Sequence, residues 1–269
     1  MKSDKAKEQR HRQIHELIVN HGQLAAEELA RRLAVTSMTI RRDLGEMQEA
    51  GLLLRVHGGA VLAKPFIREQ SFSEKAAQHL TEKRAIALAA VRMLAPKTSL
   101  YLDTGTTAAM VAQLLPVGLN LRVHTNNLRA VMDLFGREDV AVHVYGGRLM
   151  SRNPDLTGAD AVERITSVRT DVALLGADAV DPDSGEIFAA DAETAVLSRI
   201  AQRQSRRQVF LVDSSKFGGA QGQHVVGRLV PPVTRVTDGG ASVELRRKLR
   251  KLQVEVIYAR ISEPIVLAS

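Results

Sequence analysis

One stretch decides the fold of the N-terminal part of this chain: Val35-Thr36-Ser37-Met38-Thr39-Ile40-Arg41-Arg42-Asp43-Leu44. It predicts a short turn followed by a helix that has small polar residues and two arginines at its start. At about 100° per residue, Ile40, Leu44 and Met47 fall on one face of that helix, and we expect this face to pack inward. The polar residues and arginines then point away from the core.

The segments on either side complete a recognisable pattern. A helix is predicted from about Gln9 to Asn20, ending at Gly22, and a second over Glu27–Leu33. After the third helix, the segment from Gly51 to Ala60 has the glycines and apolar runs of a hairpin. Helix, turn, helix and hairpin together predict a winged helix-turn-helix, which places one helix end in the major groove of DNA.

The residues expected to contact DNA lie at the start of the third helix and on the hairpin. Thr36 is a natural N-cap, with its hydroxyl accepting from the amide of Met38 or Thr39. Arginine can bond a guanine edge through two hydrogen bonds, and hydroxyl groups suit base edges or phosphates. The predicted contacts are Thr36, Ser37, Met38, Thr39, Arg41, Arg42, Arg55 and His57. The alternative for Arg41 and Arg42 is a solvated helix face that pairs with neighbouring side chains.

Composition bounds the class of protein. The 269 residues suffice for two domains, and the net charge of +7 suits a polyanionic partner. The basic excess is spread over the chain, with 11 basic and 8 acidic residues in positions 1–64 and 26 against 22 in the remainder. A run of about 18 apolar residues is lacking, the first residues are charged and there is no cysteine. We therefore expect a cytoplasmic protein with no membrane span, metal or cofactor.

The remainder of the chain predicts a parallel α/β sheet. Residues 1–62 form the expected DNA-binding domain, 63–74 a linker and 75–269 a second domain. A helix is expected from about Ser73 to Leu94. Strands then alternate with helices; the predicted strands are Ser99–Leu102, Leu121–His124, Val140–Tyr145, Asp171–Leu175 and Val209–Val212.

Each of these strands ends in small polar or charged residues, and in open α/β sheets such ends form the ligand crevice. Thr106 and Thr107 at a helix start offer hydroxyls and free amides to a phosphate, and Lys216 adds a positive charge. Asp103 and Asp178 are placed to accept from sugar hydroxyls. Asp213 and Asp238 have the alternative role of capping loops. The five loops together favour a small, polar, phosphorylated ligand.

The chain resembles the DeoR family of bacterial sugar-responsive transcription regulators over almost its whole length. The motifs that carry the resemblance are Glu28-Leu29-Ala30, the stretch from Val35 to Leu44, Gly51–Ala60, Leu102–Thr107, Thr125-Asn126-Asn127, Gly146-Gly147, Gly176-Ala177-Asp178 and Asp213–Gly218. The resemblance implies a Rossmann-like α/β sensor domain related in fold to ribose-5-phosphate isomerase, serving as a receptor. It also implies a homo-oligomer, a dimer or tetramer, that binds operator DNA.

Carried over by position, the resemblance implies a set of effector-binding residues. These are Asp103, Gly105, Thr106, Thr107, Thr125, Asn126, Gly146, Gly147, Asp178, Glu193 and Lys216. Three departures from the family pattern stand out. Ala25 replaces a common Ser or Thr cap of the second helix, Ala179 replaces a glycine, and Phe188-Ala189 replaces a pair that is often Thr-Thr. The last change alters which sugar fits.

These inferences converge on a repressor of carbohydrate-metabolism genes that a phosphorylated sugar or polyol releases from double-stranded operator DNA. We expect no enzymatic activity. The rival is a sugar-phosphate isomerase with an attached DNA-binding module, in which Asp103, Asp178 and Lys216 would supply the acid–base groups. The sequence leaves open the effector, the operator and whether the protein represses or activates.

Overall fold

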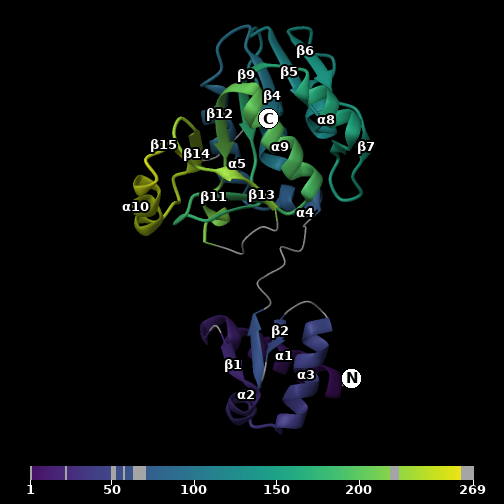
Figure 1. Cartoon of the computed structure of the whole chain (residues 1–269), viewed down its shortest axis with the longest axis vertical. Coiled ribbons are helices and arrows are strands. Elements are labelled where there is room, and N and C mark those ends of the chain that lie inside the picture. Colours follow the sequence, from purple (N-terminus) through teal and green to yellow (C-terminus); the bar gives the residue numbers. More distant parts are fainter. Residues whose placement is uncertain are drawn as a thin grey trace, which may run out of the picture. The chain divides into compact units, whose positions relative to one another are not determined.

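The computed structural model describes residues 2–21, 23–49, 53–56, 58–62, 71–218 and 224–261. The chain divides into two compact units, Met1–Arg68 and Glu69–Ser269, which we call the N-terminal and C-terminal units (Figure 1). Residues 63–70 of the predicted linker lie outside the described ranges, so the predicted domain boundaries remain a prediction. Gly22, Gly51, Leu52 and His57 also lie outside the described residues.

The N-terminal unit is the predicted winged helix-turn-helix. Its elements are the helices α1 (Lys2–His21), α2 (Ala26–Arg32) and α3 (Ser37–Glu49), and the strands β1 (Gln23–Ala25), β2 (Leu53–Val56) and β3 (Gly59–Leu62). The strands pair antiparallel in the order β1-β3-β2. Ile40, Leu44 and Met47 of α3 are buried as expected, in a core that also contains Ile14 and Leu29.

Backbone contacts, rather than a side chain, begin α2. Ala25 occupies the N-cap position and forms no side-chain cap. The Ala26 amide instead donates to the Gly58 carbonyl at 2.8 Å, in the turn between β2 and β3. A Cβ on Gly59 would collide with the backbone of Leu24 and Ala25. The close approach of β1 to β3, a strand pair that we did not predict, therefore requires glycine at this position.

The C-terminal unit is built on a seven-stranded parallel sheet within the described residues. Its strands are β4 (Ser99–Leu102), β5 (Leu121–Thr125), β6 (Val140–Val144), β9 (Thr170–Leu175), β12 (Ser205–Leu211), β14 (Thr234–Asp238) and β15 (Glu255–Ala259). They lie side by side in the order β15-β14-β12-β9-β4-β5-β6. The chain thus runs outward from β4 to β6, returns to β9 beside β4, and continues in the opposite direction, which makes the β4–β9 boundary a topological switch point.

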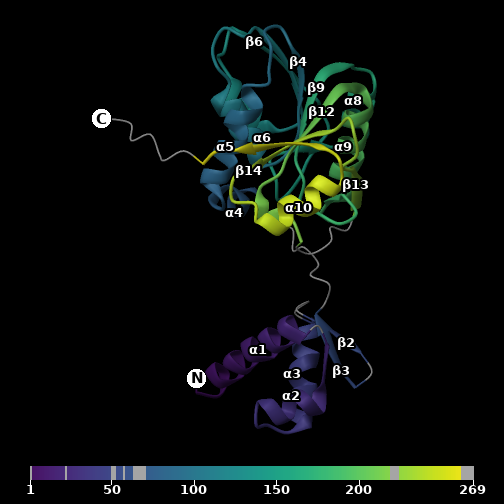
Figure 2. The same cartoon turned by 90° about the vertical axis from the view of Figure 1, so that its left-hand side faces the viewer.

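Helices cover both faces of this sheet (Figure 2). One face packs against α5 (Leu80–Val91), α6 (Thr106–Leu114) and α7 (Leu128–Leu134), around Leu100, Leu174 and other buried residues. The second face packs against α8 (Ala159–Thr166) and α9 (Ala192–Gln204), around Tyr101, Phe210 and their neighbours. The predicted fold class, a winged helix-turn-helix followed by a Rossmann-like α/β domain, is confirmed.

The helix predicted from Ser73 to Leu94 is two helices, and this expectation was wrong. Helix α4 (Phe72–Ala77) begins at Ser71, whose hydroxyl and the Glu74 carboxylate form a reciprocal capping box. The chain then breaks at Gln78 and His79, and His79 has a left-handed backbone with φ of 52° before α5 starts at Leu80. No glycine or proline occurs between Ser73 and Leu94, so the sequence contains no residue that would predict the break.

Further elements were not predicted because they are short or polar. They are the strand pair β7 (Arg148–Leu149) and β8 (Leu156–Thr157), the three-stranded sheet of β10 (Ala179–Val180), β11 (Glu186–Ala189) and β13 (His224–Arg228), the 3₁₀ turn η1 (Ser214–Lys216), helix α10 (Val243–Lys251), and the last two strands of the parallel sheet, β14 and β15. Among the described residues, no helix is both long and apolar enough to cross a membrane.

Candidate DNA-binding helix and ligand cleft

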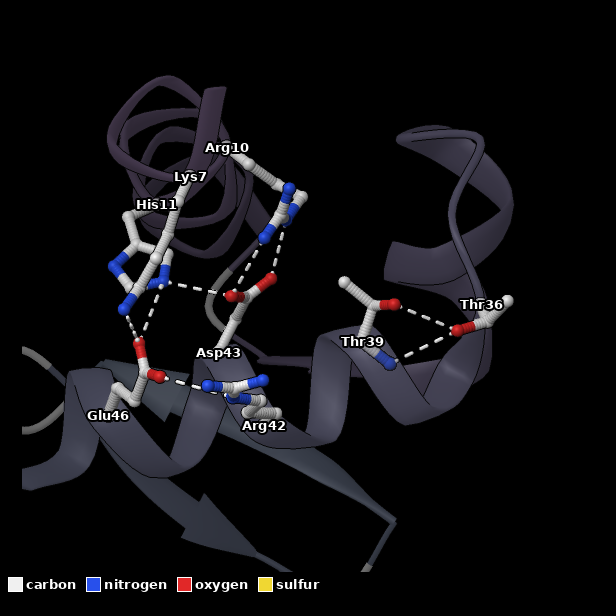
Figure 3. A network of polar contacts seen from close by, with 8 residues as sticks. All are labelled: Lys7, Arg10, His11, Thr36, Thr39, Arg42, Asp43 and Glu46. Atoms are coloured by element: carbon white, nitrogen blue, oxygen red, sulfur yellow. Dashed lines mark hydrogen bonds and ion pairs between the residues drawn. The ribbon is translucent and has the colours of Figure 1, made fainter. Parts of the chain in front are cut away.

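Helix α3 begins as the sequence predicted. The Thr39 amide donates to the Thr36 hydroxyl at 3.2 Å, and the two hydroxyls lie 2.9 Å apart (Figure 3). Met38, in the first turn, is 80% exposed. Such a side chain suits contact with a thymine methyl group in the major groove.

The two arginines of α3 are on the solvent side of the helix and form only exposed ion pairs. Arg41 donates to Glu27 of α2 at 3.0 Å, and Arg42 lies 3.4 Å from Glu46 one turn later. Exposed pairs of this kind contribute little free energy, so both guanidinium groups can exchange these partners for DNA. Arg55 is exposed on β2. Thus seven of the eight predicted DNA contacts are placed on solvent-facing segments around α3, while His57 lies outside the described residues.

A buried carboxylate that we did not predict holds α3 against α1 (Figure 3). Asp43 is 2% exposed and accepts from Arg10 Nε at 2.5 Å, from Arg10 Nη2 at 3.0 Å and from His11 Nε2 at 3.0 Å. Burial acts to raise the pKa of Asp43, but the hydrogen bonds and charges of Arg10 and His11 outweigh it and hold the pKa below its ordinary value. The spacing from Ile40 and Met47, which puts position 43 on the buried face, was the available signal.

His11, Asp43 and Glu46 also bring their ligand-type atoms within 4.8 Å of one another. Lys7 lies 2.5 Å from Glu46, and Arg10 takes both oxygens of Asp43. The carboxylates are therefore already neutralised by cations of α1. The cluster acts as a brace between two helices, and its donor set gives no support for a metal.

The second candidate site is a cleft at the carboxyl ends of β4, β9 and β12, beside the topological switch point. It brings together six of the predicted effector residues, Asp103, Gly105, Thr106, Thr107, Asp178 and Lys216. Gly105 precedes α6 with φ of 92°, a backbone conformation that favours glycine. The Asn127 amide donates to the carbonyls of Asp103 at 3.3 Å and Gly105 at 3.2 Å, which fixes this loop.

Asp103 lies at the bottom of the cleft and links the two strands of the switch point. Its carboxylate accepts from the Gly176 amide at 3.0 Å and from the Ser198 hydroxyl at 3.3 Å. Burial raises the pKa of Asp103 to about 6, against the lowering effect of these hydrogen bonds. A carboxyl group in this range can accept a hydroxyl proton in a hydrogen bond or, when protonated, donate to an oxygen.

Three lysines supply positive charge to the cleft. Lys216 comes from η1, and its ammonium has no hydrogen bond or ion pair with any described residue. Lys75 of α4 donates to Asp178 at 2.7 Å, and Lys83 of α5, 4% exposed, donates to the carbonyls of Lys75 and Gln78. Burial lowers the pKa of Lys83. Burial acts to raise the pKa of Asp178, yet Lys75 keeps it below its ordinary value.

Five predicted effector residues do not line the cleft. Thr125 and Asn126 are buried: the Thr125 hydroxyl donates to the Leu102 carbonyl at 2.6 Å, and Asn126 accepts from the Tyr101 hydroxyl at 3.0 Å. Gly147 packs against the backbone of Thr157. Gly146 precedes it in the same loop. Glu193 binds Arg148 at 2.8 Å instead.

The strand order explains this correction. The loops after β5 and β6 lie to one side of the switch point, and the β7–β8 hairpin packs onto them, with the Leu156 amide bonded to the Asn126 carbonyl at 2.8 Å. Asn153 and Asp155 of that hairpin line the cleft in their place, together with Lys75, Lys83, Asp191 and Thr194. These residues come from helices and a hairpin that are distant in sequence from the loops after β4, β9 and β12. No local sequence pattern predicted them. Asp213 caps η1 and Asp238 accepts from the Ser214 amide, so both form the capping contacts that we considered.

Comparison with known proteins identifies both units. A model of the DeoR C terminal sensor domain matches residues 78–236, and a model of the DeoR-like helix-turn-helix domain matches residues 10–66. The chain belongs to the DeoR family. This DeoR-family protein is a DNA-binding transcription regulator, with α3 as the second helix of its helix-turn-helix.

Two relatives have long matches to this DeoR-family chain. The glycerol-3-phosphate regulon repressor of Escherichia coli (strain K12) is 36% identical over 210 residues, 78% of this chain and 82% of the relative. The transcriptional regulator GlpR of Haloferax volcanii is 32% identical over 249 residues, 93% of this chain and 96% of the relative. Ribose 5-phosphate isomerase A from Methanocaldococcus jannaschii is 19% identical with a TM-score of 0.37, over 50% of this chain and 53% of that one.

Proposed function

We propose that this DeoR-family protein is a repressor of carbohydrate-metabolism genes that leaves its operator when a phosphorylated sugar or polyol occupies the cleft. The observation that carries the proposal is the composition of the cleft. It combines free hydroxyls and helix-start amides at Thr106 and Thr107, the unpaired ammonium of Lys216, and the carboxylates of Asp103 and Asp178. The first two attract a phosphate, and the carboxylates accept from hydroxyl groups.

The E. coli relative is named a repressor of the glycerol-3-phosphate regulon, which makes a short polyol phosphate the first compound to test. Ala189 lines the cleft of this chain. Because alanine has no hydroxyl, the hydrogen bonds around the carbon chain of the effector differ from those of a relative with threonine at this position. The effector of this chain therefore has to be identified with a panel of compounds and cannot be assigned from a relative.

The contact between Lys75 and Asp178 suggests how occupancy of the cleft is transmitted. Helix α4 is the first described helix after residues 63–70, and its Lys75 reaches across the cleft to Asp178. An effector hydroxyl or phosphate that takes one of these partners weakens the attachment of α4. A tenfold preference of the effector for the detached arrangement shifts that balance by about 1.4 kcal/mol.

Anisotropy of a labelled DNA fragment from upstream of the protein's own gene tests the proposed function. We expect tight, salt-dependent binding that one sugar or polyol phosphate of the panel reverses. DNA binding that no compound changes would refute the effector part of the proposal. Mass photometry of the same samples tests the homo-oligomer, which remains a prediction along with the cytoplasmic location.

The rival function, an isomerase, has one supporting observation: a carboxyl group with a raised pKa lies in the ligand cleft at Asp103. We propose that the protein has no turnover. Steady-state assays with aldose and ketose phosphates are expected to give no activity above a protein-free control. Activity that disappears in Asp103→Asn would establish the isomerase instead.

Replacing Arg42 by alanine tests the DNA contact of α3. If Arg42 binds a base, the variant loses about 1–3 kcal/mol of operator affinity and tolerates base changes at one position. A uniform loss over all sequences would assign Arg42 to a phosphate. Arg250→Ala is the matched control, because it removes the same charge from an exposed position on α10. Equal affinities of the two variants would contradict the contact.

Replacing Lys216 by alanine tests the phosphate contact in the cleft. We expect the effector concentration for half-release of DNA to rise at least about tenfold, because a hydrogen bond to a charged group is lost. Operator affinity without effector stays unchanged. Lys251→Ala, an exposed lysine of α10, serves as the control. A wild-type effector response in Lys216→Ala would contradict the assignment.

A further inference from the structure

A second polar hollow lies at the opposite end of the sheet from the effector cleft. It opens at the amino ends of β4, β5, β9 and β12, on the face of the sheet that carries Tyr101. Three arginines from separate elements reach it: Arg122 from β5, Arg169 from the loop before β9, and Arg206 from β12. The hollow extends along β5 and β6 to His124 and His143, and it shares no described lining residue with the cleft.

The charges in this hollow are not balanced by the protein. Asp171 is the one carboxylate among its described lining residues, and it lies 3.8 Å from Arg206. The other oxygen of Asp171 accepts from the Ser99 amide at 2.9 Å. Arg169 has a backbone carbonyl, that of Arg203, at 3.4 Å, and Arg122 has no side-chain partner among the described residues. Two guanidinium charges therefore remain without a counter-charge.

A buried histidine beside these arginines lacks a hydrogen-bond partner. His124 is 7% exposed, and its Nδ1 is buried with no partner in the described part of the chain. Its ring is stacked on His143 of the neighbouring strand, with centroids 4.6 Å apart and planes at 11°. Burial, followed by the effects of His143, Arg164 and Arg122, lowers the pKa of His124 to about 4. The ring is therefore neutral at pH 7, and in one tautomer Nδ1–H is an unused donor.

Buried polar atoms in proteins are nearly always paired, and unpaired positive charges in a concave site attract anions. We propose that this hollow is a second anion-binding site, which takes the phosphate group of a small phosphorylated metabolite. Arginine forks bind phosphate oxygens in pairs, and His124 and His143 line the same hollow beside the arginines. The cations converge on one hollow, whereas a surface that follows the DNA backbone needs a row of them. Neither the cleft nor α3 is needed for this site.

Histidine ring resonances in NMR spectra of the full-length protein provide the test, with inorganic phosphate and then pyrophosphate as probes. We expect saturable shifts of His124 and His143 in the wild type and in Lys216→Ala. Arg122→Gln, a change at an exposed position, is expected to weaken the binding about tenfold or more. Arg250→Gln is the matched control and is expected to titrate like the wild type.

Three results would overturn the proposal. The His124 and His143 resonances could stay unmoved by either probe, or Arg122→Gln could titrate like the wild type. Sodium chloride at the same ionic strength could also reproduce the shifts, which would reduce them to screening. Shifts caused by duplex DNA and not by phosphate would assign the hollow to nucleic acid instead. Since the readout needs neither operator binding nor an effector, failure here is distinguishable from failure of the proposed repressor function.

Discussion

Replacing Asp43 by alanine is expected to lower the free energy of unfolding of the N-terminal unit by about 3 kcal/mol. The carboxylate is buried and is the shared partner of Arg10 and His11. The substitution removes the main partner of Arg10, whose side chain is only 21% exposed. Because Asp43 joins α3 to α1, we expect the variant also to lose operator affinity, although Asp43 itself is buried.

The composition of the chain offers a clean measurement. It has no tryptophan, and its three tyrosines, Tyr101, Tyr145 and Tyr258, are all in the C-terminal unit. Tyrosine fluorescence therefore follows that unit alone, while circular dichroism follows both. We expect Asp43→Ala to lower the unfolding midpoint of the N-terminal unit, which circular dichroism detects. The unfolding midpoint of the C-terminal unit, measured by tyrosine fluorescence, should stay unchanged. Glu49→Ala, an exposed acidic residue on the same helix, is the control, and an equal effect of the two changes would contradict the brace.

The same contact predicts a dependence on pH. The folded state holds the pKa of Asp43 below its ordinary value of 3.8. A carboxyl group with a depressed folded pKa stabilises the protein above the unfolded pKa, and this stability disappears as the pH falls through the folded value. The N-terminal unit should thus lose stability below about pH 4. Asp43→Asn should make that acid dependence shallower, and an unchanged acid profile would assign it to other carboxylates.

Replacing Arg235 by methionine is expected to raise the free energy of unfolding of the C-terminal unit by about 2–3 kcal/mol. Arg235 of β14 is 0% exposed, and none of its three guanidinium nitrogens has a hydrogen-bond partner in the described residues. The guanidinium carbon of Arg235 lies 4.9 Å from the centre of the Phe217 ring, in a cation–π contact. Methionine has a similar length and packs in the apolar surroundings without a charge.

Burial lowers the pKa of Arg235 to about 10, against the raising effect of Tyr258. The folded state therefore holds this proton less tightly than the unfolded state, and the resulting destabilisation of the folded state is fully present at neutral pH. It is relieved as the pH rises above about 10, so the gain in stability from methionine is largest below that pH. The midpoint of tyrosine fluorescence in urea measures the change, with Arg250→Met as the control. A loss of stability would mean that Arg235 has a bound counter-ion in solution.

Much of the structure of the N-terminal unit could be predicted from the sequence. The 3–4 spacing of Ile40, Leu44 and Met47 and the cap at Thr36 are local properties of the chain, and both are as predicted. Asp43 was missed as a buried residue because its partners, Arg10 and His11, come from a helix more than 30 residues earlier. The spacing from Ile40 and Met47 placed position 43 on the buried face, but only the distant partners explain why a carboxylate is stable there.

In the C-terminal unit, the sequence was sufficient to predict that apolar strands alternate with helices and that polar residues follow the strands. This much depends on local periodicity and on turn residues. Which loops meet depends on the strand order. The order β6-β5-β4-β9-β12 places the loops after β4, β9 and β12 at the cleft and leaves Asn126 and Gly146 to one side. The contributions of Lys75 and Lys83, the basic hollow beside His124 and the burial of Arg235 likewise come from contacts between distant segments. Local pattern specifies the elements, and burial and charge pairing depend on how those elements pack.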